Sequence, residues 1–367
     1  MNAPFTVPRT VSIGGMGKTR RLRIGGAADV SVQTMWKEGI ACASADADAL
    51  FSVRARIEEL EKLGCDILRF AVPDRESADN LIRIADEVSM PLVADIHFDY
   101  KLALRCLDGN VAKIRINPGN IGSRERIQAV AEKAADRGAA IRIGVNAGSL
   151  PLDLRKQVAA GTMSRAEALA ETAFRETELL EELDFHNVVV SMKASSVAET
   201  IEANEAFARR FDYPLHIGVT EAGPLIGGIV KSTLAFSRLL GEGIGSTIRV
   251  SLSSSMIDEV IAGGEILKET GKRSGGVRIV SCPRCGRNGF DVHGFVDRWQ
   301  SELLSRRQDI TVAVMGCVVN GPGEAQHADI GITGAGDTVI IFRKGEKVRT
   351  VSAEGADAAF REELEKL

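Results

Sequence analysis

The feature that most constrains this chain is an alternation of short β-rich runs with helical stretches, repeated eight times from Ser31 onward. Among the amphipathic segments between the runs are Asp46–Leu63, Ser77–Val88, Arg124–Arg137 and Arg165–Leu183. The eight expected strands are Ser31–Met35, Asp66–Val72, Leu92–His97, Ala112–Asn117, Ala140–Asn146, Asn187–Lys193, Leu215–Thr220 and Thr247–Leu252. Eight such units in about 240 residues favour a closed parallel α/β barrel of the TIM type over an open doubly wound sheet.

The segments before and after these units predict a hairpin and a second domain. Residues 9–24 surround a glycine turn and predict a hairpin over the barrel floor, and its basic run Lys18–Arg23 is typical of a solvated surface. After Thr270 the periodicity breaks, and a shorter β/α pattern follows. We therefore expect a barrel over residues 1–271 and a smaller α+β domain over residues 272–367.

The charge balance gives no reason to expect a nucleic-acid or membrane partner. The chain has 46 Lys and Arg against 50 Asp and Glu, a net charge of −4. No apolar run is long enough for a membrane span, and the N-terminus lacks a signal-peptide pattern, so we expect a cytoplasmic protein. The six cysteines are then reduced thiols or metal ligands. Cys42, Cys65 and Cys106 have no ligand-like neighbours and are expected to be buried as small apolar side chains.

Cations occur late in the expected strands, where a buried parallel strand should be apolar. They are Arg69, Arg115, Arg142, Lys193 and Arg249. The carboxyl ends of barrel strands carry the active site, and buried cations are costly unless they share anions. Asp95 and Glu221 cannot neutralise five cations, so the pattern predicts a ligand with at least two negative charges. The glycine turns at residues 118–122 and 223–228 precede helices and are weaker signs of a phosphate site.

The C-terminal cysteines indicate a metal centre. Cys282 and Cys285 form a Cys-x-x-Cys pair, and Cys317 follows in the segment Met315–Glu324. Three thiolates without a clear fourth favour an iron–sulfur cluster with one iron weakly held, and Glu324 is a candidate for that weaker ligand. A structural zinc site that uses His293 or His327, and a redox dithiol, remain alternatives.

Six motifs, in the same order, resemble those of bacterial 4-hydroxy-3-methylbut-2-enyl diphosphate synthases. The resemblance runs from about Val32 to Ile332, and the cysteine motif is highly specific. The motifs are Val93–Asp99, Arg115–Asn120, Arg142–Gly148, Thr220–Gly223, Cys282–Cys285 and Gly316–Glu324. One segment, Thr34–Gly39, departs from the Thr- and Asn-rich run expected there. The family's contacts at that corner are therefore not carried over to this chain.

The resemblance implies a reductive reaction on a cyclic diphosphate. The substrate would be 2-C-methyl-D-erythritol 2,4-cyclodiphosphate of the non-mevalonate isoprenoid pathway, which two electrons open to the linear allylic diphosphate with loss of water. Flavodoxin or ferredoxin would supply the electrons through one 4Fe-4S cluster per chain. The implied cluster ligands are Cys282, Cys285, Cys317 and Glu324. The implied substrate-binding residues are Arg69, Arg115, Arg142, Asn146, Lys193 and Ser251, and the implied catalytic residues are Glu221, Asn320 and Glu324.

The family also implies a homodimer whose active site is shared between two chains. The linker at residues 272–276 supports this expectation, because it leaves the barrel floor and is too short to carry the second domain round to the mouth of its own barrel. Two other functions remain open at this stage. One is a barrel transferase of the pterin-synthase kind with a structural zinc module, and the other is an iron–sulfur assembly or sensor protein on a barrel scaffold.

Overall fold

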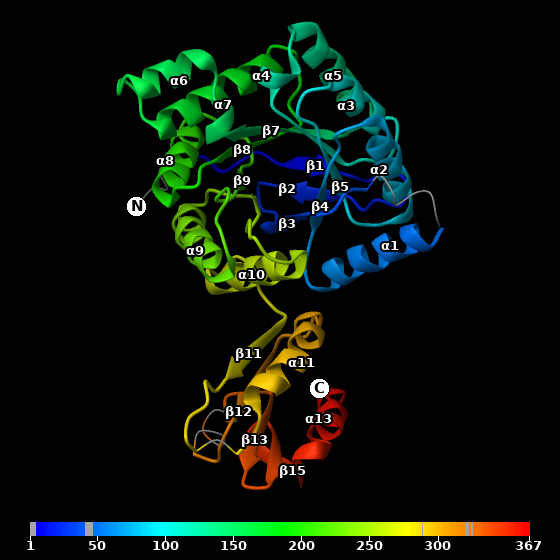
Figure 1. Ribbon diagram of the computed structural model, residues 1–367, viewed down its shortest axis with the longest axis vertical. Helices are drawn as coiled ribbons and strands as arrows, with labels where there is room; N and C mark the ends of the chain where they lie inside the picture. The colour runs from blue at the N-terminus through cyan, green and yellow to red at the C-terminus, as the bar shows by residue number, and fades with distance from the viewer. Residues whose placement is uncertain (1–4, 41–46, 288, 320–322, 324–325) are drawn as a thin grey trace. The chain divides into compact units, whose positions relative to one another are not determined.

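The computed structural model describes residues 5–40, 47–287, 289–319, 323 and 326–367. The chain divides into two compact units, Met1–Arg273 and Ser274–Leu367, and each is described by itself (Figure 1). Among the described residues, no helix has both the length and the apolar character needed to span a membrane.

The first unit is a parallel barrel. Its eight strands adjoin in the order β8-β7-β6-β5-β4-β3-β10-β9. They are β3 (Ser31–Met35), β4 (Ile67–Ala71), β5 (Leu92–Asp95), β6 (Lys113–Ile116), β7 (Ala140–Asn146), β8 (Val188–Lys193), β9 (His216–Ile217) and β10 (Thr247–Ile248). A parallel bridge between Val190 of β8 and Leu215, directly before β9, brings the two ends of this order together. The predicted TIM barrel is therefore confirmed.

The last two barrel strands are shorter than the predicted runs of six residues. The chain continues past β9 and β10 with single backbone hydrogen bonds instead of a regular ladder, from Arg249 N to Ile217 O (3.1 Å) and from Thr220 N to Ala194 O (3.0 Å). Gly218 follows β9, and a Cβ there would lie 2.7 Å from Lys193 Nζ. Regular pairing thus stops where a charged side chain lies close against the backbone.

Helices surround the sheet in Figure 1. They are α1 (Ala47–Lys62), α2 (Arg75–Glu87), α3 (Tyr100–Cys106), α4 (Pro118–Ile121), α5 (Arg124–Asp136), α6 (Leu152–Ala159), α7 (Arg165–Glu181), α8 (Val197–Ala208), α9 (Leu225–Gly241) and α10 (Met256–Glu269). Several begin at a side-chain cap. Ser164 and Ser255 accept hydrogen bonds from the third residue of α7 and α10, which satisfies a backbone N–H at the first turn.

A hairpin closes the barrel floor, as predicted. β1 (Val11–Ile13) and β2 (Leu22–Ile24) pair antiparallel. Val11, Ile13 and Ile24 pack in one apolar cluster with residues at the starts of five barrel strands. Those residues are Ile67, Val93, Ala112, Ala140 and Val189. Since parallel strands all begin at the same end of the barrel, the hairpin fills the end opposite the mouth.

The second unit is a five-stranded sheet with helices. Its strands run β11 (Val277–Ser281), β12 (Ile310–Met315), β13 (Ile330–Ala335), β14 (Thr338–Arg343) and β15 (Glu346–Ser352), the first three parallel and the last two antiparallel. Helices α11 (Val292–Leu304) and α13 (Ala356–Leu364) pack on the sheet through an aromatic cluster. In it Phe295 and Trp299 of α11 meet Phe360 of α13, with ring centroids 5.1 and 4.9 Å apart.

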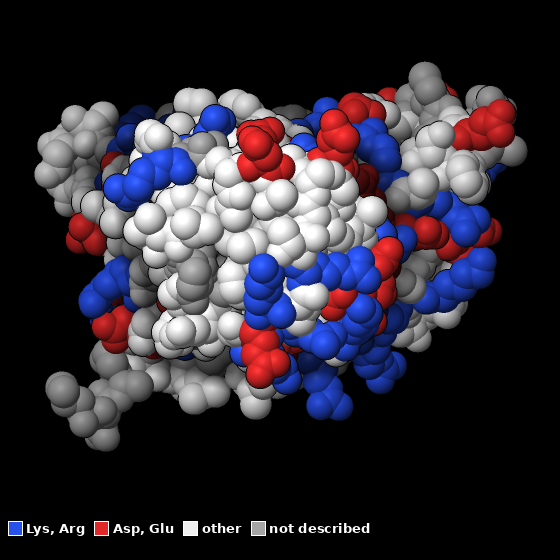
Figure 2. Space-filling view, turned by 90° about the horizontal axis from the view of Figure 1, so that it is seen from below, with Lys and Arg blue, Asp and Glu red and all other residues white. Residues whose placement is uncertain are grey.

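Charged side chains of both signs lie together on the surface. Figure 2 shows Lys and Arg beside Asp and Glu along the margins of a broad area that carries no charge. This mixture agrees with the small net charge of −4.

Candidate functional site

Three cations inside the barrel have no carboxylate partner among the described residues. They are Lys113 of β6, Arg142 of β7 and Lys193 of β8, and their exposed fractions are 0%, 1% and 6%. Arg142 donates to Ser191 Oγ (2.6 Å), but its Nε and Nη2 have no hydrogen-bond partner, and neither has Lys113 Nζ. Buried donors without acceptors are costly, so these groups are suited to an added anion.

Two further cations share Asp95 at the end of β5. Arg115 Nη1 lies 3.0 Å from Asp95 Oδ1, and Arg69 Nε lies 3.5 Å from Asp95 Oδ2. Arg115 also donates to the carbonyl of Gly144 (2.9 Å), and a Cβ at that glycine would lie 2.2 Å from Arg115 Nε. The backbone of β7 therefore leaves space for Arg115 as well as an acceptor. Asp95 is one negative charge between two guanidinium groups, so it leaves this pair cationic.

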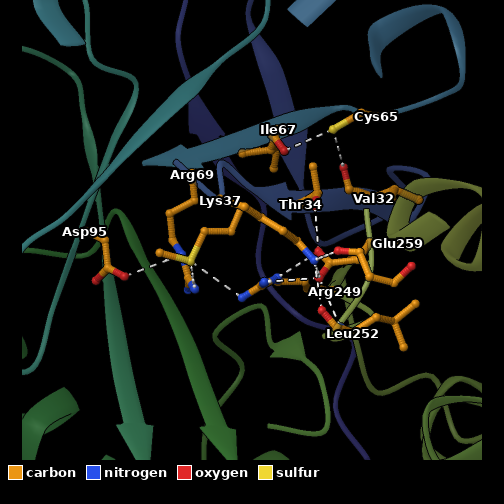
Figure 3. A network of polar contacts seen from close by, with 12 residues as sticks. Val32, Thr34, Lys37, Cys65, Ile67, Arg69, Asp95, Arg249, Leu252 and Glu259 are labelled. Carbon is orange, nitrogen blue, oxygen red and sulfur yellow. Dashed lines mark hydrogen bonds and ion pairs between the residues drawn. The ribbon is translucent and has the colours of Figure 1, made fainter. Parts of the chain in front are cut away.

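Glu259 of α10 neutralises the cations next to β3 and β10 (Figure 3). Its carboxylate accepts from Arg249 Nε and Nη2 (both 3.3 Å), from Thr34 Oγ1 (2.6 Å) and from the Leu252 backbone N–H (3.0 Å). Lys37 Nζ lies 3.0 Å from the same carboxylate and donates to the Leu252 carbonyl (2.8 Å). The segment Thr34–Gly39, which departs from the family pattern, thus supports the fold, because Thr34 and Lys37 contact the buried carboxylate of Glu259.

The barrel cations act on one another electrostatically. Burial, followed by the charges of Arg142, Arg69 and Arg249, lowers the pKa of Lys193 well below its usual value. Burial raises the pKa of Asp95, but the guanidinium groups of Arg69 and Arg115 outweigh it and hold that pKa below its usual value. The interior of the barrel is therefore a region of excess positive charge.

A cavity of about 420 Å³ opens at the mouth. It brings together the predicted residues Arg115, Asn146 and Glu221. Its other lining residues are His97, Asn120, Ala147, Gly148, Ser149, Arg165, Ser195 and Thr220. Glu221 has a positive φ of 50°, a conformation that non-glycine residues rarely adopt and that concentrates at functional sites.

The other predicted substrate residues do not line this cavity. Arg142 and Lys193 are buried inside the barrel, whereas Arg69 of β4 and Ser251, which follows β10, are half-buried. Asn320 and Glu324 lie outside the described residues. Sequence reasoning missed Glu259 and His216, which contact Arg249 and Lys193. A glutamate in the first turn of a helix and a histidine in an apolar run are both ordinary, so neither gives a signal by itself.

Cys282 and Cys317 lie at the same end of the second sheet. Cys282 directly follows β11, and Cys317 comes two residues after β12. These strands are parallel, with Ser281 paired to Val314, and Cys282 N donates to Val314 O (3.0 Å). Cys285 is exposed, three residues after Cys282. The turn between them contains Arg284 at a φ of 70°. Cys65 and Cys106 are buried, as predicted, and Cys42 lies outside the described residues.

The three C-terminal cysteines offer thiolate donors. Thiolates are the ligands that hold iron–sulfur clusters, and each one binds a different iron. The donor chemistry of Cys282, Cys285 and Cys317 fits such a group. Over the described ranges, no three His, Cys, Asp or Glu side chains converge closely enough to hold one metal ion.

The sequence of the first unit matches the GcpE TIM-barrel domain over residues 13–264, and that of the second matches the GcpE protein C-terminal domain over residues 278–366. The chain belongs to the GcpE family. A GcpE relative from Treponema pallidum is 59% identical over 98% of this chain and 92% of its own length, and one from Treponema denticola is 56% identical over 98% and 99%. A third, from Geobacillus thermodenitrificans, is 46% identical over 95% and 92%.

All three GcpE relatives bear the name 4-hydroxy-3-methylbut-2-en-1-yl diphosphate synthase (flavodoxin). The family expected from the sequence motifs is thus confirmed over nearly the whole chain. Among solved structures, dihydropteroate synthase from Xanthomonas albilineans has a TM-score of 0.46 at 14% identity, and the match covers 68% of this chain and 94% of that one. A likeness at this level carries no functional argument.

Proposed function

We propose that this chain is an iron–sulfur oxidoreductase that converts 2-C-methyl-D-erythritol 2,4-cyclodiphosphate to 4-hydroxy-3-methylbut-2-enyl diphosphate. The observation that carries the proposal is a set of buried cations that pair with no carboxylate of the described residues, Lys113, Arg142 and Lys193. A diphosphate supplies the missing negative charge. The names of the GcpE relatives give the matching activity.

The barrel residues bind and orient the diphosphate. Arg69, Arg115, Arg142 and Lys193 form the anion clamp, because they come from β4, β6, β7 and β8 and exceed in charge the one carboxylate, Asp95 of the intervening β5, that pairs with them. Asn146 and Ser251 assist with uncharged hydrogen bonds. Arg142 has two unused donors, Nε and Nη2, that a phosphate oxygen pair can accept from together.

Glu221 and Asn320 act beside the reacting carbons in this proposal. Glu221 lines the mouth cavity together with Arg115 and Asn146. Its backbone has a φ of 50°, a strained conformation of the kind that concentrates at functional sites. Asn320 and Glu324 take their roles from the family motif alone.

One 4Fe-4S cluster per chain would be held by Cys282, Cys285, Cys317 and Glu324. When bound, it passes electrons singly from reduced flavodoxin, with ferredoxin as the alternative donor, to the substrate. The cysteines bind as thiolates, which a reducing cytoplasm preserves. A carboxylate from Glu324 is a harder ligand than thiolate and leaves more easily, which suits a position next to substrate.

Two chains would share each active site in a homodimer. Arg273 fixes the start of the linker to the barrel floor, since Nη2 lies 2.7 Å from Asp66 Oδ2 and Nη1 donates to Gly64 O (3.1 Å). Residues 274–276 are then the free tether before β11, and three residues span at most about 11 Å. The tether therefore begins at the end of the barrel away from the mouth, which supports a site completed by a partner chain.

Anaerobic turnover tests the proposal. The full chain, purified without oxygen and reduced by flavodoxin, should consume the cyclodiphosphate and release the linear allylic diphosphate. Iron analysis should give about four irons per chain, and Cys317→Ala should lose both iron and turnover. A colourless protein with one zinc, or a four-iron protein that leaves the cyclodiphosphate unchanged, would refute it.

A further inference from the structure

Lys193 belongs to a chain of hydrogen bonds across three adjacent strands. Its Nζ lies 2.9 Å from His216 Nε2 in β9, and His216 Nδ1 lies 2.7 Å from Thr247 Oγ1 in β10. His216 and Thr247 are both completely buried and are register partners in the barrel sheet. Nothing in the sequence or in the proposed clamp assigns a role to this histidine.

The chemistry of the contact fixes the form of the imidazole. A lysine ammonium has only donors, so His216 Nε2 has to accept. The ring is then neutral, its proton is on Nδ1, and that proton is donated to the Thr247 hydroxyl. Burial, followed by the charges of Lys193 and Arg142, lowers the pKa of His216 well below its usual value, which agrees with a neutral ring.

The backbone of β9 also makes room for the amine. A Cβ on Gly218 would lie 2.7 Å from Lys193 Nζ and 3.1 Å from its Cε, and 2.9 Å from the Arg249 carbonyl. His216 therefore supplies the acceptor and Gly218 the space. Burial alone does not demand such an acceptor, because Lys113 is even less exposed and its Nζ has no hydrogen-bond partner in the described part of the chain.

A neutral acceptor differs from the carboxylates elsewhere in the barrel. Asp95 and Glu259 hold Arg115 and Arg249 in place but cancel much of their charge. The imidazole orients Lys193 without placing a negative charge beside it. This is the arrangement required of a cation that must bind an added anion.

Building on the proposed function, we propose that His216, oriented by Thr247, is a positioning residue that directs the Lys193 ammonium toward the diphosphate without neutralising it. The residue touches neither substrate nor cluster and acts through Lys193 alone. Its effect should therefore vanish when Lys193 is absent.

A double-mutant cycle tests this on the full chain with its cluster, with inorganic pyrophosphate as the probe and calorimetry as the measurement. His216→Phe should weaken pyrophosphate binding about tenfold or more, the scale of one lost charged hydrogen bond. Lys193→Met should weaken it further. The double variant should bind no worse than Lys193→Met. His216→Asn, which retains an acceptor, should recover part of the loss and replaces His216→Phe if that variant does not fold.

Lys113→Met is the matched control, because among the described residues it removes a buried lysine that makes no hydrogen bond with His216. In that background His216→Phe should keep its full effect. Additive losses in the pair His216→Phe with Lys193→Met, or wild-type affinity in both His216 variants, would overturn the positioning role. Wild-type affinity in Lys193→Met would instead overturn the proposed clamp at this residue, so the two failures are distinguishable.

Discussion

The carboxylate of Glu259 faces the guanidinium of Arg249, with two nitrogen–oxygen pairs each 3.3 Å apart. Arg142 also lies inside the barrel but faces the hydroxyl of Ser191 and no carboxylate among the described residues. The barrel thus contains two classes of arginine. One is neutralised as part of the fold, and the other is left for a ligand.

Glu259→Gln should destabilise the fold, because it leaves Arg249 and Lys37 without their carboxylate. We expect the free energy of unfolding to fall by about 3 kcal/mol, the cost of breaking a buried pair. Chemical denaturation measures it. Glu265→Gln is the control on the same helix, since Glu265 pairs with Lys268 at the surface and should cost about 0.5 kcal/mol or less. Equal losses in both variants would contradict the assignment.

Arg142→Met should have opposite effects on stability and on binding. Without ligand, removal of a buried cation that lacks a carboxylate should raise the melting temperature. Substrate binding should weaken by about 2–5 kcal/mol, with iron content unchanged. Arg249→Met is the contrasting variant and should lower the melting temperature, because it orphans Glu259. Calorimetric melting and titration of the two variants check both signs. A lower melting temperature in Arg142→Met would show that Arg142 serves the fold.

Glu176 should make stability depend on pH. Burial raises its pKa to about 8, only one of its oxygens accepts a hydrogen bond, from Gly119 N (3.3 Å), and the other has no partner. The folded chain keeps this proton up to about pH 8, whereas the unfolded chain releases it near its usual pKa of 4.5. Stability is therefore greatest below the unfolded pKa and is lost as pH rises through the folded one.

Glu176→Gln keeps the acceptor oxygen and removes the titration. It should match wild type at about pH 5 and exceed it by about 3 kcal/mol at about pH 9. Denaturant unfolding at both pH values provides the comparison. Glu178→Gln, on the same helix but paired with Arg210 at the surface, should follow wild type throughout. A constant difference between Glu176→Gln and wild type at the two pH values would disprove the buried proton.

Subunit complementation tests the shared active site. Cys317→Ala should lack a competent cluster, and Arg142→Ala should lack a competent barrel. Mixed in equal amounts with free exchange, the two inactive variants should recover activity at about a quarter of all sites, because half of the dimers are mixed and each has one good site. No recovery, with subunit exchange proven by mass spectrometry, would place the whole site within one chain.

The barrel strands and the cations inside them could be predicted because both are visible as local patterns in the sequence. Eight apolar runs define the strands, and an arginine such as Arg142 inside one of them stands out. The partners of the cations could not be predicted in this way. Glu259 contacts Arg249 from the first turn of α10, and His216 of β9 contacts Lys193 of the neighbouring β8. Such contacts depend on barrel closure, which brings β9 beside β8.

The hairpin of β1 and β2 has a consequence for the timing of turnover. Its apolar side chains seal the barrel floor, so the cyclic substrate, the linear product and the released water all use one entrance. If the cluster domain of a partner covers that entrance, exchange of ligands and delivery of electrons cannot happen at once. Each cycle then has a fixed order, in which the substrate enters, the cover closes, electrons arrive, and the cover opens again before anything leaves. A closed floor thereby forces ligand exchange and electron delivery to take turns at the same entrance.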